Sequence, residues 1–340
     1  MSSTFIYLLL FLPLLITAEK CNKYDKRALL SIKAAFNNPY LLASWTSSSA
    51  CCEWYGIQCD PGVPGNSDGS RVTSLFISTD SNVTGTIPPA IGDLPFLTTL
   101  GFHKFPNVTG NIPYSITRLT RLTFLFLTWN SLSGPIPSFL SQIPSLTDIY
   151  LAFNKFSGSI PPELAKLPFI QIFDFSRNRL TGSIPAEFGN FNKSYPPDLV
   201  LNHNSLSGDL PVSLGVPEWG KIDLSRNNFT GDASFLFGVG KSTRYIDLSR
   251  NEFAFDLSRV TFPVNLTILD LNHNKITGSI PAQINQLVDS PYFPVFNVSY
   301  NRLCGEIPAG PITATFGVDS YFHNKCLCGS PLPPCTSKQI

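Results

Sequence analysis

The sequence has few charged residues and almost no net charge. Among 340 residues, 24 Lys and Arg stand against 23 Asp and Glu, which gives a formal net charge of +1. A nucleic-acid binder needs a surplus of cations to neutralise phosphates, so we exclude nucleic acid as a partner. The hydrophobic content of 43% excludes a disordered chain, because such chains have too little apolar surface to bury.

Long hydrophobic runs are also missing, apart from a short one at the N-terminus. Residues 5–16 form an apolar run of 12, which is shorter than the roughly 18 residues of a membrane-spanning helix. Ala18 follows the run as a small residue at a cleavage position. We therefore predict a signal peptide over residues 1–18, a secreted protein and no transmembrane segment in the mature chain.

The eight cysteines fall into two groups, one near each end of the chain. The groups are Cys21, Cys51, Cys52 and Cys59, and Cys304, Cys326, Cys328 and Cys335. An even count in a secreted chain indicates disulfides rather than a zinc site, so we expect no metal and no cofactor. A bridge between the neighbours Cys51 and Cys52 would be strained. Cys21 should pair with one of them and Cys59 with the other, which leaves two arrangements open in the first group, and all three pairings stay open in the second group.

Proline and glycine are plentiful, with 29 and 23 residues, and they recur at a regular spacing. A Leu-x-Leu segment, an asparagine, and a Gly-x-Ile-Pro ending four residues later return at steps of 23 to 27 residues. The asparagines of this frame are Asn130, Asn154, Asn178, Asn204, Asn227, Asn251, Asn274 and Asn301. Two looser copies precede them, so the sequence contains ten repeats over residues 71–308.

Each recurring residue has a physical role. Alternate leucines point inward from a short strand, and the asparagine amide can satisfy backbone groups where the chain bends. Glycine permits the next turn, which the Ile-Pro pair closes. One repeat cannot bury its apolar face alone, so stacked neighbours must share a core. We predict an α/β leucine-rich-repeat solenoid, a curved right-handed superhelix with a concave parallel β-sheet and disulfide-stapled caps.

The two ends of a solenoid need covers. Residues 19–70 are expected to form the N-terminal cap, with a helix that begins at Asp25 as its N-cap and ends near Phe36. Trp45 and Trp54 are expected to fill the end of the core. Residues 309–340 are expected to form the C-terminal cap.

Two surface features complete the chain. The Gly-, Pro- and Ser-rich segment 61–70 is predicted to be a mobile loop. Six Asn-x-Ser/Thr sequons predict a glycoprotein. They are at Asn82, Asn107, Asn192, Asn228, Asn265 and Asn297.

Several segments are similar to one known family over essentially the whole chain. They include the Gly-x-Ile-Pro endings, the paired cysteines of the caps, residues 38–45, 222–227, 297–305 and 321–329. Together they resemble the polygalacturonase-inhibiting proteins of plant cell walls. The resemblance implies disulfides Cys21 to Cys51, Cys52 to Cys59, Cys304 to Cys326 and Cys328 to Cys335. It also implies a monomeric plant-defence protein of the cell wall that blocks secreted fungal endopolygalacturonases, with pectin as a further ligand.

The concave face is where we expect the partner to bind. The residues before each asparagine form one column, and the middle residues of the strands form a second column. Aromatic rings dominate the early repeats, and Asp with Arg or His the later ones. Trp, Tyr and Arg are common anchors of protein interfaces. Our candidate partner-binding residues are Lys104, Phe124, Phe126, Trp129, Tyr150, Phe153, Asp174, Arg177, His203, Arg226, Arg250 and His273.

Two other functions can be weighed against this hypothesis. Asp223, Asp247 and Asp270 would lie about 5 Å apart in succession, as glycosidase carboxylates do. We expect no catalysis, because an open face with Arg226 and Arg250 should lower their pKa rather than raise it. A non-inhibitory binding module, for ice or for a peptide, is the alternative. An ice binder needs a flat, uncharged array of hydroxyls or amides, which the charged columns do not offer.

Overall fold

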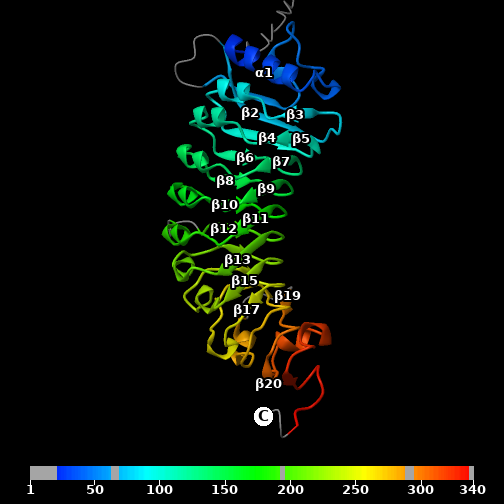
Figure 1. Cartoon of the computed structure of the whole chain (residues 1–340), viewed down its shortest axis with the longest axis vertical. Coiled ribbons are helices and arrows are strands. Elements are labelled where there is room, and N and C mark those ends of the chain that lie inside the picture. The colour runs from blue at the N-terminus through cyan, green and yellow to red at the C-terminus, as the bar shows by residue number, and fades with distance from the viewer. Residues whose placement is uncertain (1–20, 63–68, 192–195, 288–294, 337–340) are drawn as a thin grey trace, which may run out of the picture.

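The computed structural model describes residues 21–62, 69–191, 196–287 and 295–336. The predicted signal peptide, residues 63–68 of the predicted mobile loop and the sequon at Asn192 lie outside these ranges. The described chain is an elongated, curved stack of coils with the N-terminal helix α1 (Lys23–Ala35) at one end and the C-terminal segment at the other (Figure 1). No helix in these ranges is both long and apolar enough to cross a bilayer.

The concave face is one sheet of 11 strands, and it confirms the predicted ten repeats. Its first strand, β1 (Ile57–Asp60), belongs to the cap and pairs antiparallel with β2. The other ten strands follow in chain order and are parallel. They are β2 (Arg71–Ser78), β4 (Thr99–His103), β6 (Phe124–Phe126), β8 (Asp148–Tyr150), β10 (Ile172–Asp174), β12 (Asp198–Val200), β14 (Lys221–Asp223), β16 (Tyr245–Asp247), β18 (Ile268–Asp270) and β19 (Val295–Asn297).

A second parallel sheet of eight strands runs beside the first, and the repeat pattern did not predict it. Its strands are β3 (Thr84–Thr86), β5 (Asn107–Gly110), β7 (Ser131–Gly134), β9 (Lys155–Gly158), β11 (Arg179–Gly182), β13 (Ser205–Asp209), β15 (Asn228–Gly231) and β17 (Glu252–Phe253). The recurring glycines, such as Gly158 with φ 79°, lie at its strand ends. The sheet ends at β17, where Phe255 replaces the glycine, because a bulky residue does not favour that left-handed turn.

Short 3-10 helices, rather than α-helices, line the side opposite the concave sheet (Figure 1). They are η3 (Pro89–Asp93), η4 (Tyr114–Arg118), η5 (Ser138–Gln142), η6 (Pro162–Lys166), η7 (Ala186–Asn190), η8 (Val212–Gly215), η9 (Ser234–Leu236), η10 (Leu257–Arg259) and η11 (Ala282–Gln286). Most follow the proline of the Ile-Pro pair, for example Pro137 with φ −75° before η5. Proline fixes the extended entry and then allows one tight turn.

The recurring asparagines form the predicted internal ladder. Asn227 is 8% exposed, and its side-chain oxygen accepts a hydrogen bond from Leu206 N at 3.0 Å. Its amide nitrogen donates to the carbonyls of Leu201 and Leu224 at 3.0 and 3.1 Å. The same pattern recurs at Asn178, and it satisfies backbone groups that the bend between the two sheets would otherwise leave unpaired.

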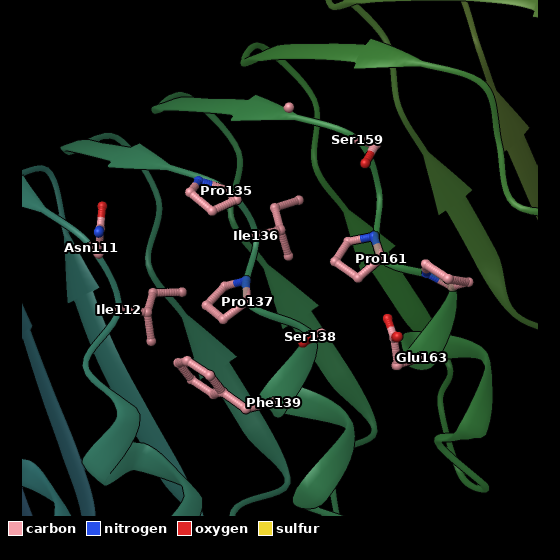
Figure 2. A pocket seen from close by; sticks show the side chains of 12 residues that line it. Asn111, Ile112, Pro135, Ile136, Pro137, Ser138, Phe139, Ser159, Pro161 and Glu163 are labelled. Carbon is pink, nitrogen blue, oxygen red and sulfur yellow. The ribbon is translucent and has the colours of Figure 1, made fainter.

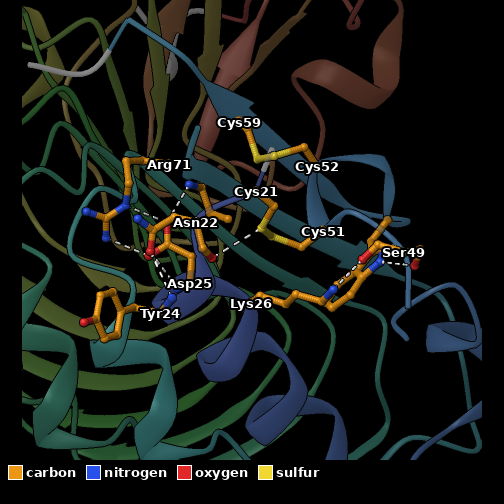
Figure 3. The surroundings of a disulfide bond; sticks show 12 residues. Cys21, Asn22, Tyr24, Asp25, Lys26, Ser49, Cys51, Cys52, Cys59 and Arg71 are labelled. Carbon is orange, nitrogen blue, oxygen red and sulfur yellow. Dashed lines mark hydrogen bonds and ion pairs between the residues drawn. A yellow bond between two sulfur atoms is a disulfide. The ribbon is translucent and has the colours of Figure 1, made fainter. Parts of the chain in front are cut away.

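The N-terminal cap corrects one prediction. Asn22, not Asp25, is the N-cap of α1, and its side-chain oxygen accepts a hydrogen bond from Tyr24 N at 2.9 Å. Asp25 is fully buried instead and binds the Arg71 guanidinium at 2.7 and 2.9 Å and Val72 N at 2.9 Å (Figure 3). Asp25 thus ties the helix to the first strand of the first repeat, which a pattern of spacing could not reveal.

The apolar side of the cap is as predicted. Leu29, Ile32 and Phe36 are buried, and they close the end of the core. Trp45 and Trp54 are also buried, with their rings stacked at 5.6 Å.

All four disulfides that the resemblance implied are present. Cys21 pairs with Cys51, Cys52 with Cys59, Cys304 with Cys326, and Cys328 with Cys335. The third pair joins β20 (Cys304–Glu306) to β21 (Cys326–Cys328) at the C-terminal end, next to the short helices η12 (Thr313–Thr315) and η13 (Val318–Ser320). The sulfur atoms of Cys21, Cys51 and Cys52 lie within 4.8 Å of one another. Each of these three sulfurs is held in a disulfide.

Candidate functional site

The residues that precede the ladder asparagines, and Lys104 at the equivalent place in the repeat of β4, share an unusual backbone conformation. Each has a φ between 53° and 59°, in the left-handed region that non-glycine residues seldom adopt. We call this set the left-handed column. Its members are Lys104, Trp129, Phe153, Arg177, His203, Arg226, Arg250, His273 and Tyr300.

The ladder of backbone hydrogen bonds holds this conformation in place. The N–H of Trp129 donates to Ala152 O, and that of Arg177 donates to Asn202 O, in each case across to the next repeat. A left-handed non-glycine residue costs roughly 1 kcal/mol or more, and these bonds offset it.

Two rings of the column stack directly on each other. Trp129 and Phe153 have centroids 3.6 Å apart at an interplanar angle of 12°. Lys104 Nζ lies 5.9 Å from the Trp129 ring, and the Arg177 guanidinium lies 4.9 Å from the Phe153 ring. Trp129 nevertheless stays 46% exposed. Four successive repeats therefore present a stack of two rings with a cation at each end, and this unit is the core of the candidate site.

A second group of rings lies on the strands themselves. Phe126 stacks on Tyr150 at 4.7 Å, and Phe124 lies 6.2 Å from Phe126. Phe124 is 40% exposed, while Phe126 and Tyr150 are half-buried. The structure thus brings the predicted early aromatic residues together on the concave face.

The aspartates of the later repeats behave differently from our expectation. Asp223 is only 6% exposed, and burial, followed by the charge of Asp247, raises its pKa to about 6. Burial likewise raises the pKa of Asp270 to about 6. We expected the nearby arginines to lower these pKa values. That expectation was wrong, because the loss of hydration outweighs the attraction of the nearby cations, Lys221 at Asp223 and Arg250 at Asp270.

These aspartates bind their own strand ends rather than the arginines. An oxygen of Asp223 accepts hydrogen bonds from Ser225 N and Oγ at 3.2 and 2.7 Å. Asp174 does the same with Ser176, and Asp270 with the backbone and side-chain nitrogens of Asn272. This recurring Asp-x-Ser/Asn motif ends β10, β14, β16 and β18. It gives these carboxylates a structural role that needs no catalysis.

The arginines of the column are left available to a partner. Among the ion pairs of the described residues, none joins the aspartates of the concave face to Arg177, Arg226 or Arg250. The two histidines are weaker cations than we expected. Burial, and then the nearby arginines, lowers the pKa of His203 and of His273.

Two hollows lie apart from the Trp129–Phe153 stack. One, of about 620 Å³, lies between neighbouring Ile-Pro turns and is lined by Ile112, Pro135, Pro137, Phe139 and Pro161, among others (Figure 2). The other, of about 460 Å³, lies at an edge of the concave sheet and is lined by Lys221, Tyr245 and Asn265, among others.

The second sheet carries a regular array of hydroxyl groups, which the charged columns of the concave face do not offer. In seven successive strands, from β3 to β15, the residue after the buried one is a partly or fully exposed Thr or Ser. These are Thr84, Thr109, Ser133, Ser157, Thr181, Ser207 and Thr230.

The sequons divide between faces. Asn107 and Asn228 are exposed on strands of the second sheet, Asn82 is exposed just before β3, and Asn265 is exposed before β18. Asn297 lies on the concave face, as predicted, and its oxygen accepts hydrogen bonds from Ser299 N and Oγ. Sugar on Asn297 would confine a partner to the earlier repeats.

Comparison with known proteins identifies the family. The Leucine rich repeat N-terminal domain matches residues 22–60, and the Leucine Rich Repeat matches residues 121–143, 145–167, 169–191 and 265–287. A protein named Polygalacturonase inhibitor 2, from Arabidopsis thaliana, is 54% identical over 98% of this chain and 100% of its own length. The chain belongs to the plant polygalacturonase-inhibitor family. The Polygalacturonase inhibitor of Pyrus communis is 52% identical over 98% of both chains.

This family shares its fold with proteins of other activities. The crystal structure of a plant ice-binding protein superposes with a TM-score of 0.88 at 45% identity, over 94% of this chain and 99% of the other. Function within the family therefore has to be argued from surfaces.

Proposed function

We propose that the protein inhibits secreted fungal endopolygalacturonases by binding them through its concave face and obstructing the access of pectin. The observation that carries this proposal is the Trp129–Phe153 stack with a cation at each end. Exposed rings on a regular face are costly unless a partner covers them. Relatives that match essentially the whole chain bear the name of polygalacturonase inhibitors.

The face is large enough and has suitable chemistry. Ten parallel strands at about 4.8 Å spacing cover roughly 45 Å, which accommodates a standard protein interface. The rings would exclude water at the centre of the contact. Lys104, Arg177, Arg226 and Arg250 would meet acidic groups, such as the catalytic carboxylates of a glycoside hydrolase. We count Asp174, His203 and His273 among the contacts, with the histidines acting mainly as neutral hydrogen-bonding groups.

The same proposal gives the setting in which the protein works. Four disulfides favour an oxidising compartment, in keeping with secretion into the plant cell wall, a glycosylated surface and a role in defence. The protein acts as a monomer and as a binder rather than an enzyme. Pectin is a second ligand through the same exposed cations.

An inhibition assay tests the proposal directly. Purified protein is added to a panel of fungal endopolygalacturonases, and the release of reducing ends from polygalacturonate is followed with and without it. We expect inhibition of at least one enzyme at micromolar concentration or below. No effect on any member of the panel would refute the proposal.

Ice binding is the second candidate, and a specific observation favours it. The row of Thr and Ser on the second sheet is the regular hydroxyl array that such a function needs, and a plant ice-binding protein has the same fold at 45% identity. Against it, the strands of this row also carry exposed Lys155 and Arg179 and the sequons Asn107 and Asn228. Charges and sugars would interrupt a flat contact with ice.

An ice-recrystallisation assay separates the two functions, because they use different faces. If ice binding occurs, Ser157→Lys combined with Thr181→Lys should abolish it and leave polygalacturonase inhibition intact. Trp129→Ala should weaken polygalacturonase inhibition and leave any ice binding intact.

A further inference from the structure

The rings of the concave face begin two repeats earlier than the sequence indicated, on β2 rather than on β6. Phe76 lies in β2 at the position in register with Gly101 of β4, which is itself in register with Phe126 of β6. Phe76 is 39% exposed. The first repeat is irregular, so its spacing did not point to this ring.

Phe76 and Phe126 meet although a whole strand lies between them. Residues two strands apart are separated by about 10 Å at the backbone, yet these two ring centroids are 5.9 Å apart with planes at 74°. This edge-to-face geometry is the favourable one for aromatic pairs. The rings can close over β4 only because Gly101 places no side chain between them.

The size of Gly101, rather than its backbone, explains why glycine stands there. Gly101 is buried, and it is not among the glycines with a positive φ, so no turn requires it. A Cβ atom added at Gly101 would lie 2.1 Å from Cδ2 and 2.6 Å from Cε2 of Phe76. The Phe76 ring therefore rests directly on the Gly101 backbone, and any side chain at that position would push it away.

We propose that Phe76 contacts the inhibited enzyme and that Gly101 is the positioning residue that holds its ring in the contact surface. With Phe76 in place, one aromatic surface continues from Phe76 to Phe126 and on to Tyr150, which stacks at 4.7 Å. Such a surface fits an aliphatic or aromatic side chain of a protein partner. The inference rests on the proposed function and extends the interface to the first repeat.

Three variants test it, namely Phe76→Ala, Gly101→Ala and the double variant. The inhibition constant is measured against an enzyme that the unaltered protein inhibits, and the melting temperature is measured alongside. Each single variant should weaken inhibition by about tenfold or more. The double variant should be no weaker than Phe76→Ala alone, because Gly101 acts only through the ring. Tyr114→Ala is the matched control, since this ring is 63% exposed on η4, and it should leave inhibition unchanged.

The outcomes separate this inference from the proposed function. Unchanged inhibition by Phe76→Ala overturns the inference and leaves the proposed function standing. Failure of the unaltered protein to inhibit any enzyme overturns both. If the double variant loses as much inhibition as the two single variants together, Gly101 affects inhibition independently of the Phe76 ring. If Gly101→Ala does not fold, Phe76→Ala against Tyr114→Ala decides whether the ring is a contact.

Discussion

Trp129 and Phe153 stack at 3.6 Å although each belongs to a different repeat. Their contact is possible because both residues have left-handed backbones, with φ 59° and 57°, so that both side chains leave the chain in the same direction. Equivalent residues of neighbouring repeats therefore come close enough for their rings to stack. The candidate interface is built by repetition rather than by a loop.

The first prediction concerns this stack. Trp129→Ala combined with Phe153→Ala should abolish inhibition, with a loss of about 2 to 4 kcal/mol of binding free energy, as expected for central aromatic anchors. Thermal unfolding should stay nearly unchanged, because Trp129 is 46% exposed. Inhibition kinetics and calorimetry measure the two effects. A large fall in melting temperature would instead assign these rings to the core.

The second prediction concerns Arg226 and Arg250. Replacing both with Ala should slow association with the enzyme more than it speeds dissociation, since long-range attraction acts on the encounter. The effect should shrink as salt rises, because ions screen exposed charges. Arg179→Ala is the control, since Arg179 is exposed on the second sheet. Surface plasmon resonance at several salt concentrations gives both rates, and an equal effect of Arg179→Ala would contradict the prediction.

The third prediction is a dependence of stability on pH. The pKa of Asp223 rises from 3.8 to about 6 on folding, so between these values the folded protein binds more protons than the unfolded chain. The free energy of unfolding should therefore fall as pH rises through this window and level off above it. Asp223→Asn removes the contribution of this carboxyl, while that of Asp270 remains, and should be more stable than the unaltered protein at pH 7 by about 3 kcal/mol.

The structure supplies a precedent for the Asp223→Asn variant. Asn297 occupies the equivalent place in β19 and makes the same two hydrogen bonds, to Ser299 N and Oγ. Denaturant unfolding from pH 4 to pH 7 measures the difference. Asp319→Asn, at an exposed position, is the control. If the difference in stability between Asp223→Asn and the unaltered protein stays constant from pH 4 to pH 7, the raised pKa of Asp223 is refuted.

The fourth prediction compares two Arg–Asp pairs. Asp25→Ala should lower the free energy of unfolding by about 3 to 5 kcal/mol, because it leaves Arg71 without its buried partner. Asp93→Ala breaks an equally short pair with Arg118, but both side chains are more than half exposed, so the loss should stay below about 1 kcal/mol. Thermal or denaturant unfolding measures both losses. If Asp25→Ala and Asp93→Ala lose the same free energy of unfolding, burial does not determine the strength of these ion pairs.

The sequence by itself determined the repeat, and with it most of the fold. The asparagine ladder, the ten parallel strands and the order of side chains along each column follow from a period of 23 to 27 residues, because each repeat meets only its neighbours. The residues of the left-handed column could be named in advance for the same reason. The disulfide pairing came from resemblance, since spacing alone left two arrangements at Cys51 and Cys52.

Only the tertiary structure decided the features that depend on what lies across a strand or a coil. Asp223 reads as an exposed aspartate, yet neighbouring coils bury it and raise its pKa. The sequence pattern predicts that Asp25 caps a helix, yet its carboxylate binds the side chain of Arg71, which lies 46 positions away. Phe76 meets Phe126 across Gly101. In each case hydration, charge or ring contact depends on distances between separate segments, which a one-dimensional pattern does not contain.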